Sequence, residues 1–450
     1  MPTVADTQEF ALSAEQMKVF NLIENTNDLF YITGKAGSGK STLLNHLRTH
    51  TKKRFIVAAP TGISAVNVRG STIHSAFRLP PRLIKPDELF VNCTANYGQL
   101  LRRLDMLILD ECSMVRVDVM TGIDTILKKA RPQSAHLPFA GLQLIMFGDT
   151  LQLPPVVEHS LEGYFNKTYG SPYFFDSPAI KEATIQLIEL QEVFRQTEPE
   201  FKALLDAIRD GTVTQKQIEH LNTRVLPPED AEKLPKDGTV ILASTNEIAR
   251  QVNNKKLSKI PHPQFFSTAR TTGNFSQDRY PTDEVLLLKK TAQVLMLAND
   301  RKHRWVNGSL GKITRISPSE FDDEYGEFAA IYVEIDGEEF RVPRETWGTV
   351  KYFWSNRDNS VREEAVNSFT QLPMKPAWGI TIHKAQGATF DSVTVDLGHG
   401  AFAFGQVYTA LSRCRSFEGL HLKRPLRMKD ILVDPKVLSF LKKVQRGQFQ

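Results

Sequence analysis

A glycine-rich segment that ends in a lysine and a hydroxyl residue is the part of this sequence best suited to chemistry. Gly34 is followed, after four residues, by Gly39, Lys40 and Ser41, which matches the pattern G-x4-G-K-[ST]. An apolar run at 28–33 precedes the segment and an amphipathic run follows it. This strand–loop–helix setting is the one the pattern requires, and it disfavours the alternative of a glycine-rich turn that binds nothing.

A loop of this kind binds phosphate groups through its backbone. Successive N–H groups point at the β-phosphate, and the positive end of the following helix dipole adds to the attraction. We expect Lys40 to reach the β- and γ-phosphates of ATP and Ser41 to ligate Mg²⁺. The nucleotide-binding residues expected in this segment are Gly34, Gly37, Ser38, Gly39, Lys40, Ser41 and Thr42.

Two adjacent acidic residues, Asp110 and Glu111, follow the apolar run 106–109. They stand at the carboxyl end of a predicted strand, where ligands of open α/β sheets bind. Asp110 is expected to hold the Mg²⁺ through water, and Glu111 to orient or deprotonate the attacking water. An acidic pair alone is often a solvated strand end, but the glycine-rich segment favours the catalytic interpretation.

Alternating apolar and amphipathic runs predict two α/β domains with parallel sheets. The first set has strands at 28–33, 54–60, 106–111 and 142–149, with helices at 40–50 and 120–131. The second set has strands at 239–245, 378–382, 392–397 and 419–423, with helices near 199–210, 246–256 and 402–414. Residues 285–350 contain only strand-like runs, which predicts a small β-barrel inserted in the second domain.

The composition is that of an ordinary globular protein of several domains. The chain has 450 residues, 41% of them hydrophobic, and no apolar run approaches the roughly 18–20 residues of a membrane span. The three cysteines, Cys93, Cys112 and Cys414, lie too far apart for a zinc motif or a disulfide framework. Residues 1–10 contain no Lys or Arg, so we expect no export or mitochondrial signal and a cytoplasmic location.

The net charge of +5 is unevenly distributed along the chain. Residues 318–347 contain ten acidic and two basic residues, whereas residues 421–450 contain eight basic and two acidic residues. Most of the chain is therefore basic, which indicates either a polyanionic partner or a solvated basic surface.

Seven further segments place polar or charged residues at predicted strand ends and helix starts. They are 12–16, 59–62, 70–74, 147–156, 193–196, 379–387 and 408–413. Together with the glycine-rich segment and the acidic pair, they resemble the motifs of superfamily 1 helicases, in the same order and over nearly the whole chain. The resemblance is greatest to the Pif1 group of the 5′→3′ branch.

The resemblance implies a role for several residues in ATP hydrolysis. The residues placed in catalysis are Lys40, Glu111, Gln152, Arg195 and Arg413, and Gln16 and Gly387 are added to those that bind the nucleotide. The two arginines come from the second α/β domain, so ATP is expected in a cleft between the domains, with hydrolysis dependent on closure. Gln152 is expected to sense the γ-phosphate and couple it to movement.

The resemblance also implies contacts with single-stranded DNA. The expected residues are Thr61, Gly62, Ser71, His74, Phe77, Thr381, His383 and Lys384. Their hydroxyl, imidazole and ammonium groups suit phosphate contacts, which position DNA without reading its sequence. Phe77 is either a stacking platform for a base or a core residue.

The fold implied is two RecA-like P-loop domains with parallel sheets, an SH3-like β-barrel insertion and a small wedge-like insertion. We expect a first domain at 1–180 with the wedge at about 78–100, a second domain at 181–284 and 366–450, and the barrel at 285–365. In the barrel, the basic turn 301–304 is expected to contact DNA, while the acidic stretch 320–327 faces away from phosphate. The chain resembles a minimal catalytic core, as in bacterial or viral members.

The function implied is that of an ATP-dependent 5′→3′ DNA helicase. Its expected partners are single-stranded, forked or structured DNA, including G-quadruplexes and RNA–DNA hybrids, in repair, recombination or telomere maintenance. We expect no membrane partner and a monomer in solution, with a dimer on DNA as the alternative. Two other functions stay open: a RecD-like motor subunit of a recombination complex, and an ATP-switched nucleic-acid clamp.

Overall fold

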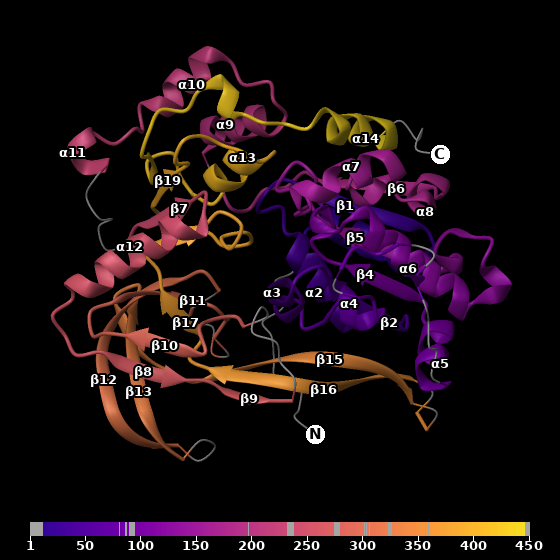
Figure 1. Cartoon of the computed structure of the whole chain (residues 1–450), viewed down its shortest axis with the longest axis horizontal. Helices are drawn as coiled ribbons and strands as arrows, with labels where there is room; N and C mark the ends of the chain where they lie inside the picture. Colours follow the sequence, from indigo (N-terminus) through magenta and orange to yellow (C-terminus); the bar gives the residue numbers. More distant parts are fainter. Residues whose placement is uncertain are drawn as a thin grey trace. The chain divides into compact units, whose positions relative to one another are not determined.

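The computed structural model forms two compact units (Figure 1). It describes residues 12–80, 82–85, 88–89, 95–196, 198–231, 238–273, 280–300, 302, 304–305, 307–322, 326–355, 357–358 and 360–445. Unit 1 comprises Met1–Phe194, Gly348–Asn367 and Asp434–Gln450, and unit 2 comprises Arg195–Trp347 and Ser368–Val433. No helix in the described part of the chain has the length and apolar character needed to cross a membrane.

Unit 1 is built on a six-stranded sheet in the order β3-β2-β4-β5-β1-β6, with all neighbouring strands parallel. The strands are β1 (Leu29–Gly34), β2 (Phe55–Ala59), β3 (Ser71–Thr72), β4 (Met106–Leu109), β5 (Gln143–Phe147) and β6 (Ile185–Leu190). The central strands β4 and β5 are buried along their whole length and mostly apolar, as expected for a sheet covered on both faces. This parallel sheet confirms the α/β prediction for the first part of the chain.

The helices of unit 1 surround this sheet or pack on one another. They are α1 (Ala14–Asn25), α2 (Lys40–His50), α3 (Gly62–Asn67), α4 (Ile73–Ala76), α5 (Ala95–Arg103), α6 (Val117–Ala130), α7 (His159–Thr168), α8 (Pro178–Glu182) and α14 (Pro435–Gln445). Leu43, Leu44 and Leu47 of α2 share one core with Phe30 and Ile32 of β1. Because α2 starts directly after the glycine-rich segment, this packing fixes the helix end at which the sequence predicts a phosphate.

A long hairpin of β15 (Glu345–Ser355) and β16 (Ser360–Gln371) contributes its outer part to unit 1 (Figure 1). There the Trp354 ring lies 4.4 Å from the guanidinium carbon of Arg103, and the Tyr352 hydroxyl group lies 3.4 Å from the Val57 nitrogen. The compact units thus follow a different division from the domain boundaries expected from the sequence, which stay predictions.

Unit 2 contains a second, four-stranded parallel sheet in the order β18-β7-β19-β20. Its strands are β7 (Val240–Ala243), β18 (Gly379–Thr381), β19 (Val393–Asp396) and β20 (Leu420–Leu422). Its helices are α9 (Pro199–Arg209), α10 (Gln215–Asn222), α11 (Pro228–Ala231), α12 (Asn246–Lys259) and α13 (Gln406–Leu411). The second parallel sheet is thereby confirmed as well.

The predicted all-strand insertion is present as an antiparallel sheet in the order β14-β13-β12-β11-β17. The strands are β11 (Gln293–Met296), β12 (Leu310–Asp322), β13 (Gly326–Ile335), β14 (Glu338–Val342) and β17 (Met374–Pro376), with the shorter β8 (Phe265–Thr268), β9 (Arg270–Thr272) and β10 (Val285–Leu288) beside them in the chain. Trp305, Ile313, Val333 and Trp378 lie in its core. Its likeness to an SH3 barrel stays a prediction, as does the wedge at 78–100, part of which lies outside the described residues.

Candidate nucleotide and DNA sites

The glycine-rich segment forms a tight loop between β1 and α2. Gly39, the residue that caps α2, has a φ of 78°, in the left-handed region that glycine adopts without strain. A Cβ atom on Gly34 would lie 2.6 Å from the Ser38 hydroxyl oxygen and 2.9 Å from the Leu190 carbonyl oxygen. Glycine is therefore required at both ends of the loop, and α2 begins directly after its last glycine.

The Lys40 ammonium group lies inside the curve of this loop. It donates hydrogen bonds to the carbonyl oxygens of Gly34 (2.6 Å) and Lys35 (3.1 Å) and lies 3.4 Å from the Ser38 hydroxyl. Ser41 is exposed at the first turn of α2, and Thr42 is half-buried. Lys40 thus lies against the loop and Ser41 is open to solvent, and their contacts with phosphate and Mg²⁺ stay predictions.

Gln16 connects α1 with the phosphate loop. Its side-chain oxygen accepts a hydrogen bond from the Ser13 N–H (3.0 Å), which completes a capping box at the start of α1. Its amide nitrogen donates to the Gly39 carbonyl oxygen (3.1 Å), and the residue is only 3% exposed. The sequence predicts an adenine contact for Gln16, and the structure adds a contact with the phosphate loop.

Replacing Gln16 by alanine should raise the KM for ATP about tenfold, because a buried hydrogen bond to the loop is lost. The KM for GTP should be measured beside it. If Gln16 reads adenine, the preference for ATP over GTP falls; if it only supports the loop, both KM values rise together.

Ser13→Ala is the matched control for this substitution. It removes the other half of the capping box and should cost about 1 kcal/mol of stability with the KM unchanged. A rise in KM equal to that of Gln16→Ala would show that the effect comes from the helix end alone.

The acidic pair stands directly after β4, as the sequence predicts. Burial, together with the neighbouring Glu111 carboxylate, raises the pKa of Asp110 to about 7. Glu111 has left-handed backbone angles, φ 48° and ψ 43°, which are uncommon for a residue with a side chain. Two crowded carboxylates close to the charge of Lys40 fit a divalent cation, since a cation would relieve their repulsion.

Gln152 lies in the turn that follows β5. Its amide nitrogen donates to the Asp149 carboxylate (3.2 Å), and Asp149 also accepts from the Leu151 N–H (3.2 Å). Asp149 and Gln152 are buried, 2% and 9% exposed. The structure thus places the predicted γ-phosphate sensor in a hydrogen-bonded turn after β5, the strand that pairs with β4, which precedes the acidic pair.

In unit 2, three of the predicted motifs converge on Arg195. Its guanidinium group donates to the carbonyl oxygens of Gly387 (3.2 Å) and Ser412 (3.3 Å). Arg413 is 2% exposed and donates to the Thr409 carbonyl oxygen (3.0 Å). Burial and then the charge of Arg413 lower the pKa of Arg195 well below its ordinary value. Two crowded guanidinium groups form a strongly anion-attracting centre.

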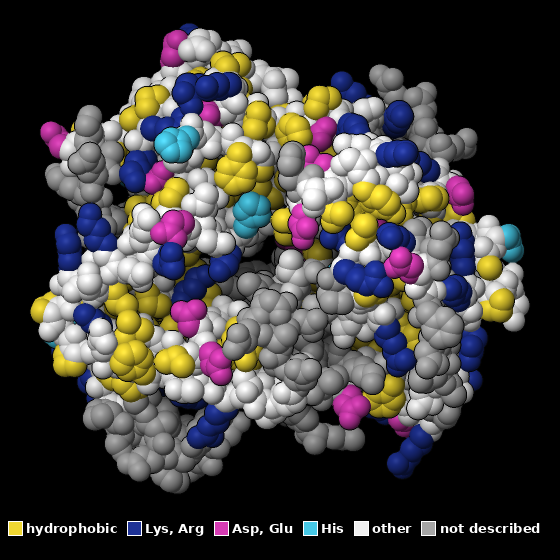
Figure 2. All heavy atoms as spheres, in the orientation of Figure 1, with side chains coloured by type: hydrophobic (Ala, Val, Ile, Leu, Met, Phe, Trp, Pro, Cys, Tyr) yellow, Lys and Arg dark blue, Asp and Glu magenta, His cyan; other side chains and the backbone are white. Residues whose placement is uncertain are grey.

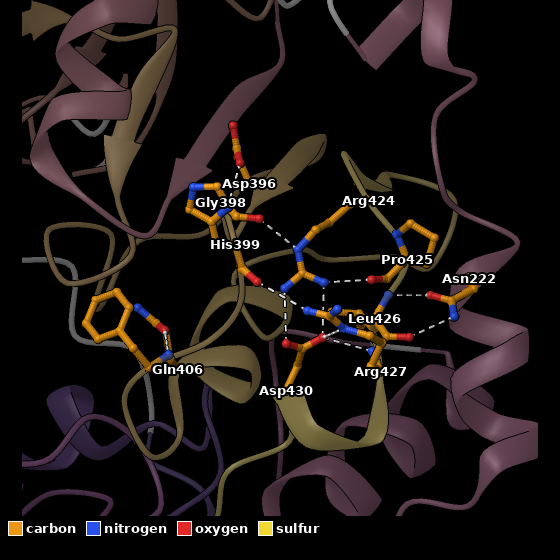
Figure 3. A network of polar contacts seen from close by, with 11 residues as sticks. Asn222, Asp396, Gly398, His399, Gln406, Arg424, Pro425, Leu426, Arg427 and Asp430 are labelled. Atoms are coloured by element: carbon orange, nitrogen blue, oxygen red, sulfur yellow. Dashed lines mark hydrogen bonds and ion pairs between the residues drawn. The ribbon is translucent and has the colours of Figure 1, made fainter.

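The segment before α13 is held by a buried ionic network (Figure 3). Arg424 donates to both carboxylate oxygens of Asp430 (3.0 and 3.1 Å) and to the Gly398 carbonyl oxygen (3.0 Å). Arg427 donates to the His399 carbonyl oxygen (3.2 Å), and Asp430 is 2% exposed. This network fixes the loop from β19 to α13, the helix that leads to Arg413.

The predicted DNA contacts of unit 1 lie after β2 and β3, at one edge of the sheet. Thr61 is exposed with its hydroxyl 2.6 Å from that of Ser64, and Gly62 begins α3. Ser71 is 1% exposed, and His74 is half-buried on α4. Phe77 is fully buried, so it offers no ring face to a base, and its burial fits the core interpretation.

The predicted DNA contacts of unit 2 follow β18. The Thr381 hydroxyl accepts from the Lys384 N–H (3.3 Å); the Lys384 side chain is exposed, and burial lowers the pKa of His383. Sequence reasoning missed Lys375, whose pKa is lowered to about 8 by burial and then by the charge of Lys384. It lies on β17, outside every motif, so neither its type nor its spacing gave a signal.

The basic turn of the insertion is only partly described. Arg301 and His303 lie outside the described residues, as does part of the acidic stretch 320–327. Arg304 forms an ion pair with Asp300 (2.7 Å) and lies 4.7 Å from the Trp305 ring. Its charge is therefore already paired within the turn, and the DNA contact stays a prediction.

Comparison with known proteins gives a consistent result. The profile of the PIF1-like helicase family matches residues 11–219. The ATP-dependent DNA helicase Pif1 of Bdellovibrio bacteriovorus is 30% identical over 97% of this chain and 93% of its own length. The chain belongs to the PIF1-like helicase family.

Solved structures of this family match over almost the whole chain. Pif1 from Bacteroides sp in complex with ADP-AlF4 has a TM-score of 0.88 and 32% identity, over 98% of both chains. The Bacteroides Pif1 bound to single-stranded DNA has a TM-score of 0.68 and 33% identity, over 97% of this chain and 98% of its own. These matches confirm the two parallel-sheet domains expected for a PIF1-like helicase.

Proposed function

We propose that this chain, an ATP-dependent DNA helicase of the PIF1-like family, moves along single-stranded DNA in the 5′→3′ direction and separates duplex or structured DNA. One observation supports this most. The segment that carries Arg195 starts at the phosphate loop, because the N–H of Phe194 donates to the Gly37 carbonyl oxygen (2.9 Å). The arginine motif thus follows directly in the chain on a residue that is hydrogen-bonded to the loop proposed to bind phosphate.

The residues of unit 1 would bind ATP and prepare the water for attack. The N–H groups of the loop and the Lys40 ammonium hold the β- and γ-phosphates, and Glu111 orients the water. Ser41 and Asp110 would hold Mg²⁺, which neutralises phosphate charge when bound. ATP use is characteristic of the family, whereas the role of Mg²⁺ and of each residue is part of the proposal.

The arginines of unit 2 would stabilise the charge that develops on the transferred phosphoryl group. Arg195 and Arg413 already crowd one another, so an anion lowers the energy of both. Because these arginines belong to a different unit from Lys40, hydrolysis would depend on how the units move. Gln152 would report the presence of the γ-phosphate to the rest of unit 1.

Single-stranded DNA is the proposed track. Lys and Arg side chains spread over the face shown in Figure 2, with Asp and Glu side chains between them. Thr61 in unit 1 and Lys384 in unit 2 present exposed polar groups for phosphate contacts. Such contacts predict affinity that falls as salt rises and varies little with base sequence.

Membership of the family supports the helicase over the RecD-like subunit and the ATP-switched clamp. Forked DNA, G-quadruplexes and RNA–DNA hybrids, and roles in repair, recombination or telomere maintenance, stay predictions. The same holds for a monomer in solution, for a dimer on DNA, for a cytoplasmic location and for a bacterial or viral source.

The decisive experiment combines ATPase and unwinding assays of this chain. Single-stranded DNA should raise the ATPase rate at least about tenfold, since the proposed motor hydrolyses ATP when it is on its track. Duplexes with a 5′ single-stranded tail should be unwound, and those with a 3′ tail should not. Unwinding from 3′ tails alone would refute the proposed direction, and an ATPase indifferent to DNA would favour the clamp.

A further inference from the structure

Tyr31 occupies a special position among the residues outside the motifs. It lies on β1, three residues before the phosphate loop begins at Gly34, and it pairs in register with Met146 of β5. Its side chain is fully buried, yet it ends in a hydroxyl group that needs a partner. The neighbouring Phe30 and Ile32 point into the core shared with α2, and Tyr31 is not part of that core.

The partner of this hydroxyl is Thr150, in the turn after β5. The Tyr31 oxygen accepts a hydrogen bond from the Thr150 N–H (3.1 Å) and donates one to the Thr150 hydroxyl (3.3 Å). Burial raises the pKa of the Tyr31 phenol, so the proton that it donates stays in place. Both bonds join residues that are 119 positions apart in the sequence.

Thr150 lies between the two residues that shape the sensor turn. Asp149 accepts from the Gln152 amide nitrogen (3.2 Å), and the Gln152 N–H donates to the Asp149 carbonyl oxygen (3.0 Å). A shift of Thr150 would therefore move the Gln152 side chain. The Tyr31 hydroxyl ties this turn to the strand that carries the phosphate loop.

The ring of Tyr31 packs against two other aromatic rings, one of them on the C-terminal helix α14. Its centroid lies 5.9 Å from that of Phe440 on α14 and 5.7 Å from that of Phe174. Phe440 in turn stacks on Phe175 at 4.3 Å with an interplanar angle of 8°. An aromatic cluster thus fixes where the hydroxyl can point.

We propose that Tyr31 is a positioning residue that sets the Asp149–Gln152 turn relative to the phosphate loop, and so presents Gln152 to the γ-phosphate. This inference rests on the proposed role of Gln152. It places Tyr31 in the step that couples hydrolysis to DNA, and outside ATP binding. A residue that acts in this way affects turnover more than affinity.

The test is Tyr31→Phe, which removes one oxygen atom and keeps the ring. The Thr150 N–H then loses its hydrogen-bond partner, so the turn loosens. We expect the DNA-stimulated kcat to fall about fivefold to tenfold while the KM for ATP stays within about twofold. Thr150→Val, which keeps the N–H but loses the hydroxyl, should reduce kcat about twofold to threefold and replaces the first variant if that one does not fold.

Tyr173→Phe is the matched control. The Tyr173 hydroxyl donates to the Asp434 carboxylate (2.6 Å), and its ring stacks on Phe175 in the same aromatic cluster. We expect it to lower the melting temperature as much as Tyr31→Phe does, with kcat unchanged. If Tyr31→Phe and Tyr173→Phe lose kcat equally, Tyr31 acts only through stability, and the inference is wrong.

Gln152→Ala separates this inference from the proposed function. We expect it to lose DNA-stimulated kcat, and we expect the double variant Tyr31→Phe/Gln152→Ala to be no worse than Gln152→Ala, since both changes act through one side chain. If Gln152→Ala is impaired and Tyr31→Phe is not, or if the losses add, the Tyr31 inference is wrong and the proposed function stands. If Gln152→Ala is unimpaired, the proposed sensor role fails and the inference fails with it.

Discussion

Replacing Lys40 by alanine should reduce DNA-stimulated ATP hydrolysis by about a thousandfold or more, the loss typical when a charge-stabilising donor is removed from a reacting centre. The ammonium group lies within hydrogen-bonding distance of the loop carbonyl oxygens of Gly34 and Lys35, at the start of α2. Steady-state ATPase with saturating single-stranded DNA measures the effect.

Affinity for single-stranded DNA should change little in Lys40→Ala, because the lysine belongs to no segment expected to contact DNA. Lys35→Ala is the matched control, since it removes an equal charge from the same loop, and its ATPase rate should stay within about threefold of the unsubstituted protein. ATP turnover by Lys40→Ala at a near-normal rate would show that the loop does not bind the reacting phosphates.

Replacing Glu111 by glutamine should lower the hydrolysis rate by about a hundredfold to ten-thousandfold, the usual contribution of a general base, while ATP still binds. Glutamine has the same shape and fits the same left-handed backbone, so the fold should be unaffected. The Glu111 charge is one cause of the raised pKa of Asp110. Its loss lowers that pKa and so favours the charged form of Asp110. Binding of a fluorescent ATP analogue and single-turnover hydrolysis separate the two properties.

Glu182→Gln on α8 controls for the change of charge and should leave both properties intact, because this exposed residue lies outside the site. A Glu111→Gln variant that no longer binds ATP would contradict the assignment of Glu111 to the water. If Glu111→Gln hydrolyses ATP at the normal rate, another carboxylate must orient the water, and Asp110 should be tested first.

The phosphate loop could be predicted from the sequence because all of its functional residues are contiguous. The phosphate loop needs glycines and a lysine at fixed spacing between a strand and a helix, and all of them lie within 34–42. The strands that precede Asp110 and Gln152 are mostly apolar on both faces, so their composition marks them as buried parallel strands. The strand predicted at 28–33 is observed as Leu29–Gly34, and the strand predicted at 142–149 is observed as Gln143–Phe147.

Only the tertiary structure decided what each buried side chain contacts. The apolar run 28–33 predicts that Tyr31 is buried in a strand, but it does not show which residues from distant parts of the chain contact the side chain. The Tyr31–Thr150 and Gln16–Gly39 hydrogen bonds join residues 119 and 23 positions apart, and no local pattern encodes such pairs. The grouping of α14 with unit 1 is likewise a matter of tertiary packing, since an amphipathic helix buries its apolar face against whichever surface the fold supplies. Residue type and spacing thus determined the chemistry this chain can perform, while long-range packing decided which residues hold that chemistry in place.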